Sequence, residues 1–363
     1  MKKEKLVAQI ALTISSRPGR AAKENPIFRG MQIAMDELKN DDTFPVQLDW
    51  KVFDDFANKE TAEKLALEIV KDLSIIGVVG SMGSDETFAN APIFHKADLV
   101  QVSPCASHPD LCRQGYRTFF RLVANENLQG GALASIAYSY LNSRQVAIVH
   151  VDDLWGVAVS EVFEQEFSKL GGSIIQKVVY QPTEDDFSGL ITAMGAAKPD
   201  LVLMAVHAVE GPTISSGLRE SGLRVPFLGT DAMKPVFPLG GGETGEQAYH
   251  THSGADFRRL PGASAFRKAY SSRFDEDSTY SPEAYDACML IAQALRFSGH
   301  ADRARVLEWV RNVSDFQGVS GIINFDQTGE RIDAPISCYR VAKTEKGREM
   351  EYLGTFLELL SRD

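Results

Sequence analysis

The chain has 363 residues, enough for two domains of ordinary size, and its 44% hydrophobic and 24% charged residues are typical of a globular protein with a hydrophobic core. Its formal net charge is −11, from 38 Lys+Arg and 49 Asp+Glu. An acidic chain lacks the basic face that neutralises phosphates, so neither nucleic acid nor an anionic membrane surface is expected as a partner. No apolar run approaches the roughly 18 residues of a membrane-spanning helix, so no direct membrane insertion is expected.

The first twenty residues, MKKEKLVAQIALTISSRPGR, join lysines to an apolar stretch, as a signal peptide does. Gln9 and Thr13 interrupt that stretch, and no small-residue cleavage pattern precedes Arg17. We therefore interpret the segment as the first strand of the fold; an exported protein would already have lost its signal. Four cysteines are too few for a disulfide scaffold, and whether Cys105 and Cys112 form a bridge stays open.

Short apolar runs rich in β-branched residues alternate with segments of helical period along most of the chain. In the first part the expected strands are Val7–Ile14, Val46–Phe53, Ile75–Val79 and Leu99–Val102, and the expected helices are Pro26–Leu38, Lys59–Leu73 and Asp85–Lys96. After a hinge-like segment, Arg121–Gly131, the expected strands are Val146–Val151, Ile174–Tyr180, Leu201–Val206 and Val225–Leu228, with helices at Ala132–Leu141, Gly156–Leu170, Phe187–Ala197 and Gly211–Ser221. Such alternation predicts an α/β protein with two successive doubly wound units, each a parallel sheet with crossover helices.

The pattern changes beyond about Gly240. Helices are expected at Gly262–Phe274, Pro282–Phe297 and Arg303–Val313, a strand and hairpin turn in GVSGIINFDQTGE, and β segments at Ile336–Val341 and Met350–Leu357. His250 and His252 are expected at a hinge strand. No linker or low-complexity stretch separates the two halves, so several short crossings are expected to join them.

In open α/β sheets, ligands bind beyond the carboxyl ends of the strands. The turn in VVGSMGSDETF, Val78–Phe88, joins such a strand to a helix. Gly80 and Gly83 permit close backbone approach, Ser84 adds a hydroxyl, and amides at a helix start attract an anion, here a single carboxylate. The alternative, that Ser84 only caps the helix, stays open. A dinucleotide fingerprint needs a third glycine at the right spacing, which is absent.

The next turn, in LVQVSPCASHPDLCRQGYRTFFRL, places Ser107 at the same sheet edge as Ser84. Hydroxyls and amides from the two turns are expected to converge on one anionic group. Cys105, His108 and Cys112 could instead ligate a metal. Structural zinc normally has four ligands and no fourth lies nearby in the sequence, so a packed loop without metal is the preferred interpretation.

A succession of motifs resembles one known family. They read, in order, IALTISSRPG, FRGMQIAMDEL, FDD, IIGVVGSMGS, VSPCAS, GYRTFFRL, VAIVHVDDLWG, DFSGLI, KPDLVLMA, FLGTD, SPEAYDA and GVSGIINFDQTGE. Together they resemble the type I periplasmic binding proteins, with the closest similarity to the leucine/isoleucine/valine-binding branch that serves ABC importers. The resemblance spans about residues 5 to 340.

The resemblance implies two α/β lobes around a hinged cleft, with residues 1–122 plus 254–328 in one lobe and 123–253 plus 329–363 in the other. In the first lobe it implies that Ser84 binds the carboxylate of an amino acid, helped by the backbone of Cys105 and the hydroxyl of Ser107.

In the second lobe the resemblance implies that Trp155 lies exposed in the cleft, over the ligand. His207 stands where the family usually has a tyrosine, which puts its contact in doubt. Asp231 takes the place of the family's acidic partner for the ligand ammonium, which is commonly a glutamate. A buried carboxylate is costly without a cation, and the ammonium would supply one.

These expectations describe a periplasmic or extracellular solute-binding protein, without cofactor or metal and usually a monomer, that delivers a small amino acid, branched-chain-type or related, to the membrane subunits of an ABC importer. No catalytic motif indicates an enzyme. The alternative is a cytosolic regulator or a receptor's sensing domain of the same fold that binds an amide or organic acid. The ligand side chain is open, since Arg17, Arg20 and Lys23 in the loop at residues 15–26 could attract a second acidic group or face solvent.

Overall fold

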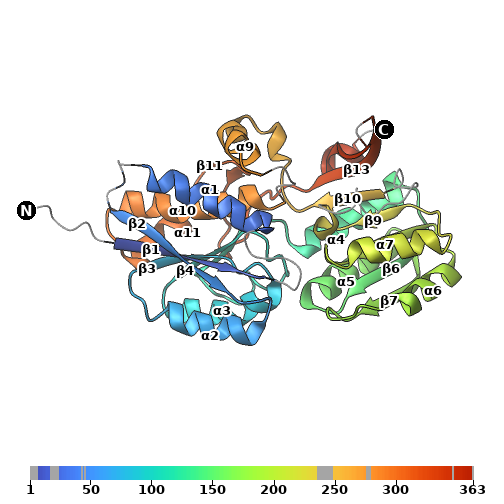
Figure 1. Cartoon of the computed structure of the whole chain (residues 1–363), viewed down its shortest axis with the longest axis horizontal. Coiled ribbons are helices and arrows are strands. Elements are labelled where there is room, and N and C mark those ends of the chain that lie inside the picture. The colour runs from blue at the N-terminus through green and yellow to red at the C-terminus, as the bar shows by residue number, and fades with distance from the viewer. Residues whose placement is uncertain are drawn as a thin grey trace, which may run out of the picture. The chain divides into compact units, whose positions relative to one another are not determined.

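A computed structural model describes residues 7–16, 24–41, 44, 46–234, 248–274, 279–345 and 347–361. The chain forms two compact units, Met1–Val123 with Asp256–Ala334, and Ala124–Ala255 with Pro335–Asp363 (Figure 1). The chain passes from one unit to the other three times. The third passage was expected after residue 328 and lies instead between Ala334 and Pro335. The reason is hydrogen bonding: Glu330 binds the Arg121 guanidinium, and Arg331 donates to the Leu122 carbonyl, so both residues belong to the first unit.

The first unit contains a five-stranded parallel sheet in the order β2-β1-β3-β4-β5. Its strands are β1 (Val7–Ile14), β2 (Gln47–Asp54), β3 (Ile75–Val79), β4 (Val100–Ser103) and β5 (Phe119–Arg121). Its helices of at least eight residues are α1 (Pro26–Lys39), α2 (Lys59–Ile69), α3 (Ser84–Lys96), α9 (Ser264–Ser271), α10 (Ser281–Ser298) and α11 (Arg303–Arg311). A short two-stranded sheet, β11 (Phe316–Gly318) with β12 (Gly321–Ile323), completes the strands of this unit.

Both faces of this sheet are covered by helices. Ile10 and Leu12 of β1 belong to the core cluster that contains buried residues of α1 and α10, whereas Ala11 between them packs in a second cluster with residues of α2 and α3. Figure 1 shows α1 and α10 on one side of the sheet and α2 and α3 on the other. Alternate side chains of a strand point to opposite faces, so a strand buried on both faces is apolar throughout.

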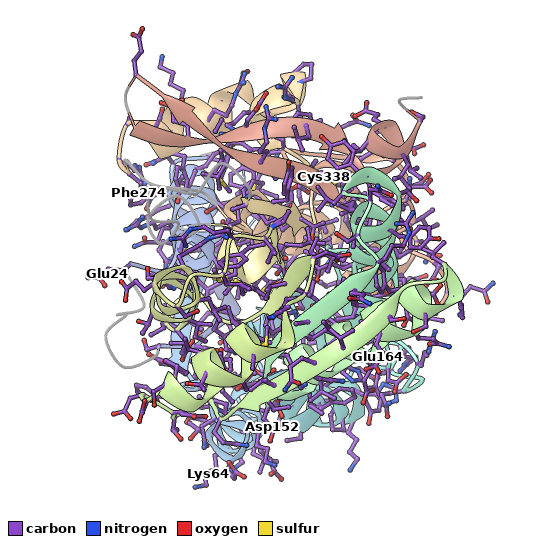
Figure 2. The ribbon with its side chains drawn as sticks, turned by 90° about the vertical axis from the view of Figure 1, so that its right-hand side faces the viewer. Glu24, Lys64, Asp152, Glu164, Phe274 and Cys338 are labelled. Carbon is purple, nitrogen blue, oxygen red and sulfur yellow. The ribbon has the colours of Figure 1, made fainter. Side chains whose placement is uncertain are left out.

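The second unit contains a seven-stranded sheet in the order β14-β13-β10-β9-β8-β6-β7. Its parallel strands are β6 (Gln145–Val151), β7 (Ser173–Tyr180), β8 (Leu201–Ala205), β9 (Phe227–Gly229) and β10 (Ala248–His252), and its antiparallel strands are β13 (Ser337–Thr344) and β14 (Gly347–Thr355). Its helices include α4 (Glu126–Ser135), continued as a π-helix at Ile136–Tyr140, α5 (Leu154–Lys169), α6 (Ser188–Ala197), α7 (Gly211–Glu220) and α12 (Phe356–Leu360). Figure 2 shows the side chains of this unit, with Cys338 labelled on β13 and Glu164 on α5.

The hinge-like segment, Arg121–Gly131, contains the boundary between the units, which lies between Val123 and Ala124. The hinge-like segment is helical from Glu126 onward, because the Asn125 side chain accepts a hydrogen bond from Leu128 N and so caps α4. Its glycines permit close packing, since a Cβ on Gly130 would lie 2.7 Å from Val162 Cγ1. His250 and His252 are buried residues of β10, which lies between β9 and β13, and the next boundary between the units follows at Ala255 and Asp256. Within the described ranges, no helix combines the length and apolar character needed to span a bilayer.

Candidate functional site

The first candidate turn follows β3 and needs a glycine at its first position. Gly80 has a φ of +121°, and a Cβ there would lie 2.1 Å from Thr13 Oγ1 and 2.6 Å from the Thr13 carbonyl oxygen. No other residue type fits this approach of the end of β3 to the end of β1 without displacing the backbone.

Ser84 is the first residue inside α3 and not its cap. Gly83 occupies the N-cap position and provides no side-chain hydrogen bond, which excludes the capping alternative for Ser84. The Ser84 hydroxyl instead accepts a hydrogen bond from His108 N at 3.3 Å. The carboxylate of Glu86 lies against Gly83, because a Cβ on Gly83 would be 1.9 Å from its Oε2. An anion at this turn would therefore rely on hydroxyls and loop amides more than on a bare helix end.

The second candidate turn is hydrogen-bonded to the first. Ser103, the last residue of β4, donates from its hydroxyl to the Ser81 carbonyl at 2.9 Å and accepts from Ala106 N at 3.0 Å. The half-buried thiol of Cys105 donates to the Met82 carbonyl at 3.1 Å. Ser107 is buried in the same loop. The structure thus brings the sequence-predicted residues Ser84, Cys105 and Ser107 to two adjoining turns of the first unit.

Neither a disulfide nor a metal site is found at this loop. Neither Cys105 nor Cys112 forms a disulfide. Burial raises the pKa of the Cys112 thiol, which disfavours the thiolate that a metal would need. Among the described residues no group of three or more His, Cys, Asp or Glu side chains is placed to hold a metal ion.

A buried polar network below the turns was not predicted from the sequence. The Ser81 hydroxyl accepts from Asn90 Nδ2 at 2.6 Å and lies 3.4 Å from Thr13 Oγ1. Gln101 Nε2 donates to the Gly80 carbonyl at 3.0 Å and to Asn90 Oδ1 at 2.9 Å. The sequence does contain a signal for this network, which is a polar residue inside an otherwise apolar strand: Gln101 in LVQVS and Thr13 in IALTI. These hydrogen bonds hold the ends of β1, β3 and β4 together, although Gln101 Oε1 itself is buried and has no hydrogen-bond partner among the described residues.

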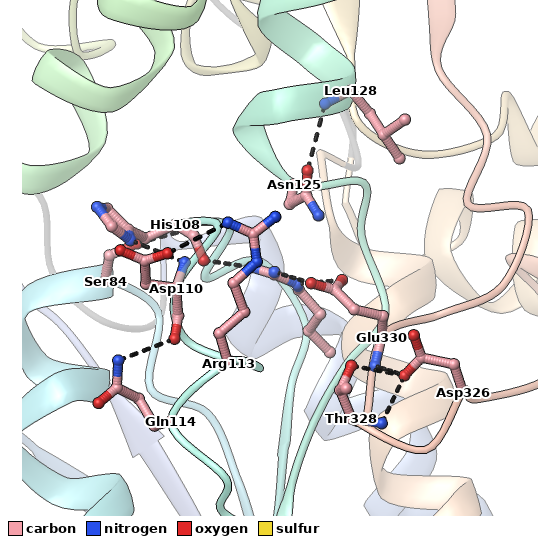
Figure 3. Close-up of polar contacts among 11 residues, drawn as sticks. Ser84, His108, Asp110, Arg113, Gln114, Asn125, Leu128, Asp326, Thr328 and Glu330 are labelled. Carbon is pink, nitrogen blue, oxygen red and sulfur yellow. Dashed lines mark hydrogen bonds and ion pairs between the residues drawn. The ribbon is translucent and has the colours of Figure 1, made fainter.

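A buried arginine anchors the loop that carries Ser107 and His108. The Arg121 guanidinium is fully buried, donates to the His108 carbonyl at 2.7 Å and forms a two-pronged ion pair with the Glu330 carboxylate. Figure 3 labels the two partners of this arginine, His108 and Glu330, together with Ser84. Burial is the main cause that lowers the pKa of His108, so the imidazole beside Ser84 is held in its neutral form.

In the second unit, Asp153 organises the turn after β6. Asp152, labelled in Figure 2, directly follows the strand. One oxygen of Asp153 caps α5 by accepting from Gly156 N at 2.7 Å, and the other lies 2.7 Å from His207 Nε2. The His207 ring stacks on the Trp155 indole with centroids 5.1 Å apart and an interplanar angle of 20°. The structure therefore brings Trp155 and His207 together through Asp153, which the sequence analysis did not identify.

Trp155 is only 9% exposed and belongs to the hydrophobic cluster of the second unit, so its ring is less open than expected. His207 follows a buried strand but has polar partners: besides the contact of its ring with Asp153, its backbone N–H donates to the Tyr180 hydroxyl at 3.3 Å.

Asp231 begins a short 3-10 turn, Asp231–Met233, directly after Thr230 at the end of β9. The residue is 6% exposed, and its carboxylate accepts a hydrogen bond from Gln129 Nε2 on α4. The sequence analysis missed Gln129 because its segment was interpreted as a hinge. Arg17, Arg20 and Lys23, expected near the pocket floor, lie outside the described residues.

Comparisons with known proteins agree with this architecture. A family model described as "Periplasmic binding protein" matches residues 14–349. An amino acid binding protein of Pseudomonas aeruginosa is 25% identical over 302 residues, which cover 81% of this chain and 79% of the relative.

Among solved structures, the branched-chain amino acid transporter substrate binding protein LivJ of Streptococcus pneumoniae, in complex with isoleucine, superposes with a TM-score of 0.84 at 21% identity and covers 96% of this chain and 99% of its own. A solute binding protein of an ABC transporter from Rhodopseudomonas palustris, in complex with 3,4-dihydroxybenzoic acid, gives a TM-score of 0.85 at 18% identity, with 96% and 97% covered. At these identities the likenesses show a shared fold.

Proposed function

The chain belongs to the periplasmic binding protein family, and from this premise we propose that it is the solute-binding component of an ABC importer and captures a small amino acid, branched-chain-type or related, between its two units. The family and the fold are those of solute-binding proteins, which are not enzymes. The proposal extends to a location in the periplasm or outside the cell, to a monomer, and to the membrane subunits of the importer as partners.

The observation that carries the proposal is the different chemistry of the two units. The turns with Ser84 and Ser107 offer hydroxyl and amide donors, which suit a carboxylate. The second unit offers the Asp231 carboxylate, which suits an ammonium. A zwitterionic amino acid has one group for each, so only a closed protein would satisfy both ends at once, and binding would favour that state. Each charge-assisted contact would contribute on the order of 2 kcal/mol.

A thermal-shift panel tests the proposal. The wild-type protein would be melted with L-amino acids, their des-amino acids, simple amides, benzoate and 3,4-dihydroxybenzoate. An amino acid at about 100 times its Kd should stabilise the folded protein by roughly 2.7 kcal/mol. If des-amino or aromatic acids shift the melting temperature and no amino acid does, the role given to Asp231 is wrong and the ligand lacks an amine.

Transport and sensing are distinguished by uptake. If the protein serves an importer, vesicles that contain the importer's membrane subunits should accumulate the labelled amino acid only when the protein is added. Tight binding without stimulated uptake would favour the sensing alternative.

A further inference from the structure

Gln129 joins three elements of the second unit at Asp231. It lies in the first turn of α4, and its amide nitrogen donates to Asp231 Oδ1 in the turn after β9 and to Thr251 Oγ1 of β10 at 3.4 Å. Its side chain is held from two sides, and the residue is 1% exposed. A surface glutamine is exposed to solvent, whereas the side chain of Gln129 is buried.

The orientation of the Gln129 amide follows from chemistry. An ionised carboxylate only accepts hydrogen bonds, so the nitrogen of the amide must face Asp231 and the oxygen must point elsewhere. Within the described part of the chain, Gln129 Oε1 is buried and receives no hydrogen bond. A buried acceptor without a donor costs about 1–3 kcal/mol, and native proteins contain few of them.

The residue that precedes Asp231 in the sequence also has a buried polar atom without a hydrogen-bond partner in the part of the chain that the structure describes. Thr230, the preceding residue, is fully buried, and no described residue forms a hydrogen bond with its Oγ1. The Gln129 amide contacts the Asp231 carboxylate through its nitrogen, so a polar ligand group that reaches this carboxylate would also supply the donor that Gln129 Oε1 lacks within the described ranges. An ammonium has three N–H donors, enough for the carboxylate and for an amide oxygen beside it.

We infer that Gln129 is a specificity-determining residue, which holds the Asp231 carboxylate through its nitrogen and accepts a hydrogen bond from the ligand ammonium through its oxygen. The inference rests on the proposed function and narrows it to ligands with a free α-amine. A ligand without the amine leaves Gln129 Oε1 buried and unsatisfied, so discrimination against des-amino acids is divided between Asp231 and Gln129.

The test compares one ligand pair in several variants by isothermal titration calorimetry. The pair is L-leucine and 4-methylpentanoate, which is leucine without its amine; if the panel shows another L-amino acid to bind instead, that amino acid and its des-amino acid replace the pair. Gln129→Met keeps the length of the side chain and removes both polar atoms. It should weaken L-leucine binding about tenfold, or 1.4 kcal/mol, and leave the Kd of 4-methylpentanoate within about twofold.

Two further variants separate specificity from folding. Gln145→Met, at an exposed position at the start of β6, should change neither Kd. Gln101→Met removes an equally buried glutamine in the first unit, below the carboxylate turn, and should weaken both ligands by the same factor. A shared loss in Gln129→Met, or an unchanged ratio of the two Kd values, would overturn the inference while the proposed function survives. If no L-amino acid binds the wild-type protein, the proposed function and the inference about Gln129 are both wrong.

Discussion

In the first unit the residues at the carboxyl ends of β3 and β4 are held by main-chain and hydroxyl hydrogen bonds, whereas in the second unit the corresponding turns carry carboxylates and stacked rings. Ser81, Ser103 and Gln101 tie the first pair of turns to each other from below. Asp153 contacts His207, and Asp231 contacts Gln129, which lies on another element of the second unit.

The difference has a physical consequence for each unit. The turns of the first unit are held by neutral hydroxyl and amide groups that bond to backbone carbonyls. A turn built on carboxylates depends on the side chains that orient them. Backbone geometry should therefore govern the first unit, and single side-chain contacts should govern the second.

The largest effect is expected from Gly80→Ala. The new Cβ meets Thr13 and the left-handed φ becomes strained, so the free energy of unfolding of the first unit should fall by roughly 3 kcal/mol or more. Denaturant unfolding followed by circular dichroism measures it. Gly115→Ala is the matched control: its φ is +76° but a Cβ there meets nothing within 4 Å, so about 1 kcal/mol is expected. Equal losses in the two variants would contradict the rigid-turn interpretation.

Asp231→Asn should have the next largest effect. Asparagine keeps the shape and an oxygen for Gln129 Nε2, so the fold should persist while the charge for the ammonium is lost. Binding of an L-amino acid should weaken by about 100-fold, which corresponds to roughly 2.7 kcal/mol. Calorimetry with the amino acid and its des-amino acid measures the loss, and an equal loss for both ligands would show that Asp231 does not meet the amine.

Ser84→Ala should weaken binding of the same amino acid about tenfold, because one hydroxyl contact to the carboxylate disappears while the backbone donors of the first unit remain. The des-amino acid should lose as much, since it keeps the carboxylate. Ser271→Ala, at an exposed position on α9, serves as the control and should leave both Kd values unchanged. An affinity in Ser84→Ala equal to wild type would refute the role of this turn.

Asp153→Asn should have the smallest effect. Asparagine caps α5 as well as aspartate does, so stability should change little, but the charged contact to His207 is lost and the stack on Trp155 loosens. Amino-acid binding should weaken about threefold. Asp302→Asn repeats the cap exchange on α11 of the first unit and should have no effect on binding. If both variants bind as wild type does, the Asp153–His207 pair serves only the fold.

Much of the architecture follows from local sequence. The strands β1 and β3 were predicted to the residue, because both are short, largely buried runs that are mostly apolar. The start of α1 was predicted from Pro26, and the structure adds the Asn25 side chain as its cap. The start of α4 was not, because a glycine pair disfavours a helix locally, whereas the Asn125 cap and packing against α5 stabilise the helix there.

For the candidate site, too, one part could be predicted from the sequence and another part could not. That Ser84 and Ser107 lie at one sheet edge follows from the sequence alone, because neighbouring parallel strands end at a common edge. The partners that orient the charged groups were decided only by the tertiary structure: 102 residues separate Gln129 from Asp231, 54 separate Asp153 from His207, and 209 separate Arg121 from Glu330. A hydrogen bond between side chains so far apart leaves no periodic pattern in the sequence, since each partner is placed by a different strand or helix of the fold.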